Sequence, residues 1–327
     1  MTKLHFGLSL LIAAISGISG LWSQPAQSAP QCSPNGEFTK RLNLPVYEWS
    51  DPEKPRKGTI VAVHGLTFYA AAYDDLASYL VEQGYSFLAV DMRGFGRWRD
   101  ENLTFGGDNL VHFTQTSEDA LRLIQTLRHD RPHEKLFAMG ESLGANVALD
   151  LVSKNPDLCD GVILGSLCYK SHIHPKIRWT IDITKGLRHP NKRLDLTPYI
   201  TPYLSHSKAL TRDCLQDKRI CRSLSPAELI KARKTNLWAL LNVEKLPPSY
   251  PVLVIAGQKD AVFKTDSLHE LFKRFGSHDL DINIFPDKGH LLLEHQAVMP
   301  EVAEIFDRWL SLQTAGEKVV VELPQQR

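Results

Sequence analysis

Cysteine is scarce in this chain, and neither sign of charge prevails. The 327 residues include five cysteines, and 38 Lys and Arg stand against 37 Asp and Glu, for a net charge of +1. So few cysteines exclude a small disulfide-held scaffold. A nearly neutral chain gives no overall electrostatic reason to expect a nucleic-acid partner. We therefore expect a globular protein, long enough for one large domain with a sizeable hydrophobic core or for two small domains.

Long apolar runs are also lacking, except near the N-terminus, where residues 6–21 are almost uncharged. Lys3 precedes this run and the small residues Ser28 and Ala29 follow it, an order typical of secretory signal peptides. We expect residues 1–29 to be a signal peptide, removed on export to give a periplasmic or secreted protein. An uncleaved membrane anchor is the alternative, because the run is near the lower length for crossing a bilayer.

An exported chain can form disulfides, and two pairs of cysteines are close in sequence. Cys214 and Cys221 are the pair that a bridge would join most readily, with two free thiols as the alternative. Cys159 and Cys168 flank a predicted strand of about nine residues, so they are too far apart to bridge each other.

Short apolar runs alternate with amphipathic stretches along most of the chain, a pattern typical of a mostly parallel sheet with helices on both faces. The predicted strands are residues 59–64, 86–90, 135–139, 161–167, 252–256 and 281–285, after an antiparallel strand within 42–49. The predicted helices are residues 73–83, 116–127, 145–155, 266–275 and 298–312. We therefore expect an α/β fold.

The alternation is interrupted once, between the strands predicted to end at Leu167 and to begin at Val252. This stretch of roughly eighty residues contains helix-like pieces such as 226–241, and a structureless loop of that length is rare in a compact domain. We interpret it as a helical cap inserted over one end of the sheet. The predicted division is core at 30–167 and 251–313, cap at 168–250 and a flexible tail at 314–327.

Positive charge is concentrated in this predicted cap. Between Tyr169 and Lys245, sixteen Lys and Arg stand against six Asp and Glu, a difference of +10 that leaves −9 on the rest of the chain. Such a surface is either an ordinary solvated basic face or one that attracts anionic substrates. It would also favour transient contact with a phospholipid surface.

One pentapeptide indicates nucleophilic chemistry: residues 140–144 read Gly-Glu-Ser-Leu-Gly, between the predicted strand 135–139 and a predicted helix. A serine on such a sharp turn is held in a strained backbone conformation and needs small flanking residues. The turn exposes its hydroxyl. We predict Ser142 as a nucleophile.

A serine hydroxyl attacks at neutral pH only when a base takes its proton and a carboxylate orients that base. Asp260 follows the predicted strand 252–256, and His290 follows the next one, 281–285. Their order after the serine is one found in such sets. We predict Asp260 as the acid and His290 as the base, with Asp287, on the loop of His290, as the alternative acid.

Attack on a carbonyl creates an oxyanion, which two N–H donors must stabilise, each lowering the barrier by roughly 3 kcal/mol. The N–H of Leu143 follows the nucleophile and supplies the first. We assign the second to Leu66, in the loop after the strand that ends with His64-Gly65. His172 and His174 suggest a metal pair, but no cluster of further ligands lies near them in sequence, and we predict solvated residues and no metal.

Taken together, the motifs resemble the α/β-hydrolase superfamily. They are His64-Gly65, Asp-Met-Arg-Gly-Phe-Gly at 91–96, the pentapeptide at 140–144, Gly257 with Asp260, and Gly289-His290. Within the superfamily the chain looks like the monoacylglycerol lipase and lysophospholipase branch, also called serine aminopeptidase-like. The resemblance covers 42–312 and implies a mostly parallel eight-stranded sheet, flanked by helices and carrying a helical cap. It places the nucleophile, acid, base and oxyanion donors on Ser142, Asp260, His290, Leu143 and Leu66.

The resemblance implies a serine hydrolase that works through an acyl-enzyme on Ser142, without a metal or organic cofactor. We expect carboxylic ester substrates, either lysophospholipids, monoacylglycerols or short-chain esters. A peptidase or thioesterase on the same fold, and a binding protein that lost catalysis, are the alternatives. Four aromatic residues of the cap are expected to line the acyl pocket: Trp179, Tyr199, Tyr203 and Trp238.

Overall fold

A computed structural model describes residues 31–99, 105–106, 109–172, 188–198, 201, 205 and 207–315. The expected signal peptide and nearly all of the expected tail lie outside these residues. In the part of the chain that is described, no helix is both long and apolar enough to cross a membrane.

The core is one eight-stranded sheet with the order β1-β2-β4-β3-β5-β6-β9-β10. Its strands are β1 (Gln31–Ser33), β2 (Val46–Ser50), β3 (Gly58–Val63), β4 (Tyr85–Val90), β5 (Leu136–Glu141), β6 (Gly161–Gly165), β9 (Val252–Gly257) and β10 (Leu280–Phe285). β2 is antiparallel to both of its neighbours, and every other pairing is parallel. The mostly parallel sheet predicted from the sequence is therefore confirmed.

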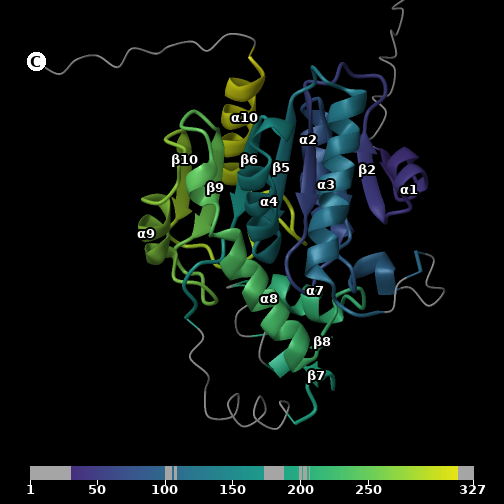
Figure 1. The fold of residues 1–327 in the computed structure, drawn as a ribbon, viewed down its shortest axis with the longest axis vertical. Coiled ribbons are helices and arrows are strands. Elements are labelled where there is room, and N and C mark those ends of the chain that lie inside the picture. The colour runs from purple at the N-terminus through teal and green to yellow at the C-terminus, as the bar shows by residue number, and fades with distance from the viewer. Residues whose placement is uncertain are drawn as a thin grey trace, which may run out of the picture.

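Helices cover both faces of this sheet (Figure 1). They are α1 (Glu37–Leu42), α2 (Asp74–Glu82), α3 (Phe113–Asp130), α4 (Leu143–Lys154), α9 (Leu268–Phe272) and α10 (Pro300–Thr314). Side chains alternate along a buried strand, so Val61 and Val63 of β3 pack on the α3 and α4 side while Ile60 and Ala62 pack on the α2 and α10 side. Such burial on both faces explains why the central strands are continuous apolar runs.

The insertion leaves the sheet after β6 and returns at β9. Its described elements, β7 (Leu194–Asp195), α7 (Lys208–Gln216), β8 (Ser223–Leu224) and α8 (Pro226–Ala239), gather beneath one end of the sheet in Figure 1. Ser225 and Glu228 form a capping box at the start of α8. The Glu228 carboxylate also pairs with Arg193, 2.8 Å away, which joins α8 to the β7 side of the insertion. The described residues also form short 3-10 helices: η1 (Ala70–Tyr73), η2 (Gly96–Arg99), η3 (Pro156–Leu158), η4 (Val243–Lys245) and η5 (Thr265–Ser267).

Two short elements of the core were not predicted, and one helix is shorter than predicted. β1 is three polar residues and α1 is one short amphipathic segment, so neither carries a hydrophobic period long enough to recognise. The helix expected at 266–275 is a 3-10 turn, η5, followed by the five residues of α9.

Of the two possibilities that the sequence left open for Cys214 and Cys221, the structure has two free thiols and no bridge between them. Cys214 packs in an apolar cluster with Leu210 and Ile220. The Cys221 thiol instead donates to the Ser223 carbonyl oxygen at 3.2 Å. The two thiols thus lie in different environments, one apolar and the other hydrogen-bonded. Cys159 and Cys168 are also free, so they do not bridge each other, as predicted.

Candidate active site

Ser142 occupies the sharp turn between β5 and α4. Its backbone has φ 55° and ψ −121°, a conformation that costs a non-glycine residue free energy unless its surroundings enforce it. The Ser142 N–H donates to the Gly165 carbonyl at the end of β6, 2.8 Å away, and its carbonyl accepts the N–H of Ala145 at 3.0 Å. These bonds fix the turn between a buried strand and a buried helix.

The two glycines around Ser142 are required by close backbone contact. A Cβ on Gly144 would lie 1.9 Å from the Val63 carbonyl oxygen of β3. A Cβ on Gly140 would lie 2.2 Å from the Gly144 carbonyl carbon. Backbone atoms cannot yield as a flexible side chain can, so the sequence requirement predicted for this turn has a direct steric cause.

The structure brings Ser142, His290 and Asp260 together, as the sequence predicted. His290 Nε2 lies 2.9 Å from Ser142 Oγ, and His290 Nδ1 lies 2.7 Å from Asp260 Oδ2. Each residue follows the carboxyl end of a strand: Ser142 follows β5, Asp260 follows β9 and His290 follows β10. Because parallel strands end at the same side of a sheet, three distant parts of the sequence meet there.

Burial and mutual charge set the ionisation of the pair. Burial alone would lower the pKa of His290, but the negative charge of Asp260 and the hydrogen bond to it raise that pKa above its usual value. Burial alone would raise the pKa of Asp260, but His290 and two backbone N–H donors lower it. Those donors are Val262 and Phe263, at 2.7 and 3.0 Å from Asp260 Oδ1. The carboxylate is thus charged and fixed, which orients the imidazole.

Asp287, the alternative acid, does not fill this role. Its side chain is 67% exposed and pairs with its neighbour Lys288 at 3.5 Å. Asp260, on the loop after β9, therefore contacts His290, although Asp287 is closer to His290 in sequence.

The loop after β3 is arranged to present the Leu66 N–H. His64 is buried, which lowers its pKa to about 4 and keeps the ring neutral. Its Nε2 accepts the Met92 N–H at 2.9 Å, so Nδ1 carries the proton and donates to the Gly65 carbonyl at 2.8 Å. Because C=O and N–H point opposite ways in a trans peptide, the Leu66 N–H is directed away from His64.

Both predicted oxyanion donors are available. Among the described residues, no hydrogen bond uses the Leu66 N–H. Leu143 is the first residue of α4, where a helix leaves its N–H groups without an intrahelical acceptor. Their place in the chain suits them to bind an oxyanion beside Ser142.

Two buried carboxyl groups of the site were missed from the sequence. Glu141 Oε1 accepts the N–H groups of Leu292 and Leu293 at 2.7 and 3.1 Å, and its Oε2 accepts that of Glu294 at 2.9 Å. Glu294 Oε1 in turn accepts the Gly65 N–H at 2.7 Å. Burial is the largest cause of the raised pKa of both groups, and it brings that of Glu141 to about 7.

These contacts fasten the loop after His290 to the turn that carries Ser142 and to the loop that carries Leu66. Glu141 lies within the recognised pentapeptide, at a position for which that motif requires no particular side chain. Nothing in the sequence pattern around Glu294 indicates its role.

Cys168 was also missed as a neighbour of the nucleophile. Its buried sulfur lies 3.6 Å from Ser142 Oγ, and burial raises the pKa of this thiol, which keeps it uncharged. The Asn146 side chain holds the Cys168 backbone through bonds to its N–H and its carbonyl, each 3.0 Å long. Asn146 also donates to the Asn236 carbonyl of α8 at 3.2 Å, so the helix after Ser142 is attached to the insertion.

The aromatic residues predicted to line an acyl pocket are not placed there by the structure. Trp179, Tyr199 and Tyr203 lie outside the described residues. Trp238 is 57% exposed on α8, a position that suits a surface role better than a pocket lining.

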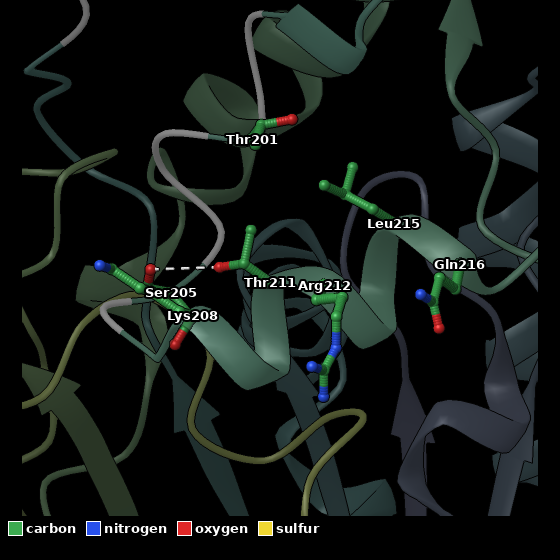
Figure 2. A pocket seen from close by; sticks show the side chains of 7 residues that line it. All are labelled: Thr201, Ser205, Lys208, Thr211, Arg212, Leu215 and Gln216. Atoms are coloured by element: carbon green, nitrogen blue, oxygen red, sulfur yellow. Dashed lines mark hydrogen bonds between the residues drawn. The ribbon is translucent and has the colours of Figure 1, made fainter.

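A cavity of about 500 Å³ opens beside α7 (Figure 2). Its lining residues are Thr201, Ser205, Lys208, Thr211, Arg212, Leu215 and Gln216. Ser142, Asp260 and His290 are not among them, so this cavity does not belong to the site.

Of the two histidines considered as a metal pair, His172 and His174, the structure describes only the first. His172 is exposed, and its backbone N–H donates to the Val262 carbonyl at 2.9 Å. His174 lies outside the described residues. Within the described ranges, no group of three or more His, Cys, Asp or Glu could hold a metal ion.

Similarity to known proteins extends across most of this chain. Residues 54–296 match the model of the family described as serine aminopeptidase, S33 (Hydrolase_4). The chain is 24% identical to human monoglyceride lipase over 82% of its own length and 86% of that protein. It is 23% identical to the monoacylglycerol lipase of Mycolicibacterium smegmatis, over 75% and 85% of the two chains.

Solved structures agree on the fold. The crystal structure of Paleococcus ferrophilus monoacylglycerol lipase superposes with a TM-score of 0.64 at 21% identity, covering 83% of this chain and 98% of the other. Because the family model matches most of the chain, this protein belongs to the serine aminopeptidase S33 family, and it has the α/β-hydrolase fold of the lipases that it resembles.

Proposed function

We propose that this protein hydrolyses the ester of a single-chain lipid, such as a monoacylglycerol, through an acyl-enzyme on Ser142. The observation that carries the proposal is the continuous hydrogen-bonded series from Asp260 through His290 to Ser142, with contacts of 2.7 and 2.9 Å. These distances suit proton transfer between a nucleophile and an oriented base.

In the first step, Ser142 Oγ attacks the ester carbonyl carbon while its proton passes to His290 Nε2. The carbonyl oxygen becomes an oxyanion, which accepts hydrogen bonds from the N–H groups of Leu143 and Leu66. Asp260 stabilises the imidazolium formed. The tetrahedral intermediate collapses when the C–O bond to the alcohol breaks and His290 returns its proton to the departing oxygen.

In the second step, water replaces the alcohol. His290 takes a proton from this water as its oxygen attacks the acyl carbon. The ester bond to Ser142 then breaks, the proton moves to Ser142 Oγ, and the carboxylic acid is released. The protein supplies every group these steps require besides substrate and water.

The choice of a lipid ester rests on the relatives, which are named monoglyceride or monoacylglycerol lipases. A positively charged insertion adds attraction for anionic head groups, such as that of lysophosphatidylglycerol. We expect the ratio of lysophosphatidylglycerol to monoacylglycerol hydrolysis to fall as salt rises from low to high concentration. A ratio that does not change with salt would contradict the proposed attraction between the insertion and anionic head groups.

The serine is tested by labelling with a fluorophosphonate probe and by hydrolysis assays. Ser142→Ala should abolish labelling and lower kcat by about 10⁴-fold or more. Ser117→Ala, at a serine that bonds to the Phe113 carbonyl within α3, is the matched control and should keep both. Parallel assays on monoacylglycerols, p-nitrophenyl esters and thioesters, and aminoacyl anilides locate the preferred bond. Faster cleavage of the anilides or thioesters would contradict the ester assignment.

A lipid substrate is presented at a surface, and α8 has a face suited to one. Ile230 and Leu237 are 48% and 49% exposed, and their spacing of seven residues puts them on one side of the helix. Leu241, 66% exposed, lies in the turn just after the helix ends. Trp238 lies beside them, and exposed lysines and arginines surround the group: Lys231, Arg233 and Lys234. Apolar and aromatic side chains bordered by cations are typical of segments that bind anionic lipid surfaces. We assign this face transient contact with such a surface.

Vesicle flotation tests that contact. The protein should float with phosphatidylglycerol vesicles more than with phosphatidylcholine vesicles, and Leu241→Ser with Trp238→Ser should reduce flotation. Leu312→Ser, at a leucine 63% exposed on α10, is the control and should leave flotation unchanged. Equal flotation of all variants would contradict the assignment to α8.

A further inference from the structure

The loop that carries the Leu66 donor, residues 64–72, is held by two parts of the molecule. The core holds its ends: the Gly65 N–H donates to Glu294 and the Ala70 N–H donates to Asp91, each at 2.7 Å. Between these points the chain contains Thr67, whose φ of 74° is unusual for a β-branched residue. A strained segment of this kind keeps its shape only where its surroundings enforce it.

The insertion contacts that middle part. The Cys221 N–H donates to the Thr67 carbonyl at 2.8 Å. The Tyr69 hydroxyl donates to the Asp217 carboxylate. Both insertion residues belong to one short turn after α7, residues 217–221, so two bonds from one turn fix two positions of the loop.

Charge and packing reinforce the Tyr69–Asp217 contact. Arg219 forms an ion pair with Asp217 at 2.9 Å and places its guanidinium 4.4 Å from the centre of the Tyr69 ring. The Asp217 side chain is only 8% exposed, so the bond is protected from water. Beneath it, loop and insertion share an apolar cluster: Phe68, Tyr69, Ala72, Leu210, Cys214, Ile220 and Leu291.

Asp217 also approaches the loop after the base. His295 Nδ1 lies 3.8 Å from Asp217 Oδ2, and the His295 N–H donates to the Ala72 carbonyl at 2.6 Å. The aspartate therefore lies where the Leu66 loop, the insertion and the segment after His290 meet.

We infer that Asp217 and Tyr69 are positioning residues through which the insertion fixes the oxyanion loop. They act through the Leu66 N–H and do not touch the substrate. A displaced donor weakens hydrogen bonding to the oxyanion formed in the transition state, and binding of the uncharged ester is affected far less. The inference rests on the proposed function, because it requires an oxyanion at Ser142.

Kinetics of Tyr69→Phe, Asp217→Asn and the double variant test it on a soluble p-nitrophenyl ester. We expect kcat to fall by about tenfold in each, with KM changed by less than about twofold. The double variant should lose no more than the worse single variant, because both act through one contact. Affinity for a trifluoromethyl ketone, which forms a tetrahedral adduct with serine, should fall by the same factor as kcat.

Tyr79→Phe is the matched control. Tyr79 donates to Asp307 at 2.7 Å, a tyrosine–aspartate bond between α2 and α10 that does not involve the oxyanion loop. It should leave kcat and ketone affinity unchanged.

Three results would overturn the inference: an unchanged kcat with a lower melting temperature, a higher KM at constant kcat, or fully additive losses in the double variant. The Ser142→Ala variant distinguishes failure of the proposed function from failure of this inference. Activity that survives Ser142→Ala refutes the proposed function, whereas an inactive Ser142→Ala beside a fully active Tyr69→Phe refutes this inference alone.

Discussion

The carboxyl end of the sheet and the insertion hold their functional side chains in different ways. At the sheet, Ser142 and Asp260 follow strands that are paired on both sides, and His290 follows β10, the edge strand paired with β9. In the described part of the insertion, exposed apolar and basic side chains face solvent, while Cys168, the turn at 217–221 and α8 contact the site. Reacting atoms need fixed positions, which a buried sheet provides, whereas substrate choice can be set on a surface whose composition varies freely.

The sheet side of this comparison should be the more sensitive to small chemical changes. Asp260→Asn should lower kcat by about 10⁴-fold, because an amide no longer holds the imidazole in the required tautomer or stabilises the imidazolium. Steady-state kinetics measure this. Asp287→Asn changes the same group on the loop of His290 and should leave kcat unaltered. A comparable fall in kcat in Asp287→Asn would mean that Asp287, and not Asp260, orients His290.

A smaller, structural effect is expected at the turn itself. Gly144→Val places a side chain where even a Cβ would lie 1.9 Å from the Val63 carbonyl oxygen. We expect the free energy of unfolding in urea to fall by about 3 kcal/mol. Lys154→Ala, at the exposed end of the same helix, should change it by less than about 0.5 kcal/mol. Equal stability of the two variants would contradict the steric account.

The next effect concerns pH. The acid limb of kcat/KM should have its midpoint above pH 6.5, because His290 must be neutral to accept the Ser142 proton and its pKa is raised above that value. The Glu141 charge contributes to this rise. Glu141→Gln should therefore lower the pKa of His290 and move the acid limb to lower pH. The exposed Glu118→Gln should leave the limb in place, and a limb that moves to higher pH in Glu141→Gln would contradict the electrostatic link.

The smallest effect is expected in the insertion, at its cysteines. A bridge between Cys214 and Cys221 would add about 2–3 kcal/mol of stability. Because both are free thiols, adding a reductant should not change the melting temperature. Cys214→Ser removes the buried thiol, so that no bridge can form, and places a polar hydroxyl in an apolar cluster. This variant should lower the melting temperature equally with and without reductant. A drop confined to oxidising conditions would show that the pair is linked.

Local signals were sufficient for the central strands, for most of the longer helices and for the three reacting residues. Continuous apolar runs predicted the central strands to within two residues at nearly every end, and helical periodicity predicted α2, α3, α4, α8 and α10. The pentapeptide at 140–144 predicted the strained turn because the steric need for glycine is itself local. Asp260 and His290 could be predicted because parallel topology places every strand's carboxyl end on one side.

Contacts between distant segments could not be predicted in this way. The sequence favoured Asp260 but kept Asp287 as the alternative acid, and only the fold of the loops excluded Asp287. Glu141 and Glu294 lie 153 residues apart, and their roles depend on which backbone N–H groups the fold brings to their carboxylates. The contact of Asp217 with Tyr69 spans 148 residues. Sequence alone determined the central strands, most of the longer helices and the chemistry of the strained turn, because these depend on neighbours along the chain. Tertiary structure decided which buried polar groups satisfy one another, because those partners meet only after folding.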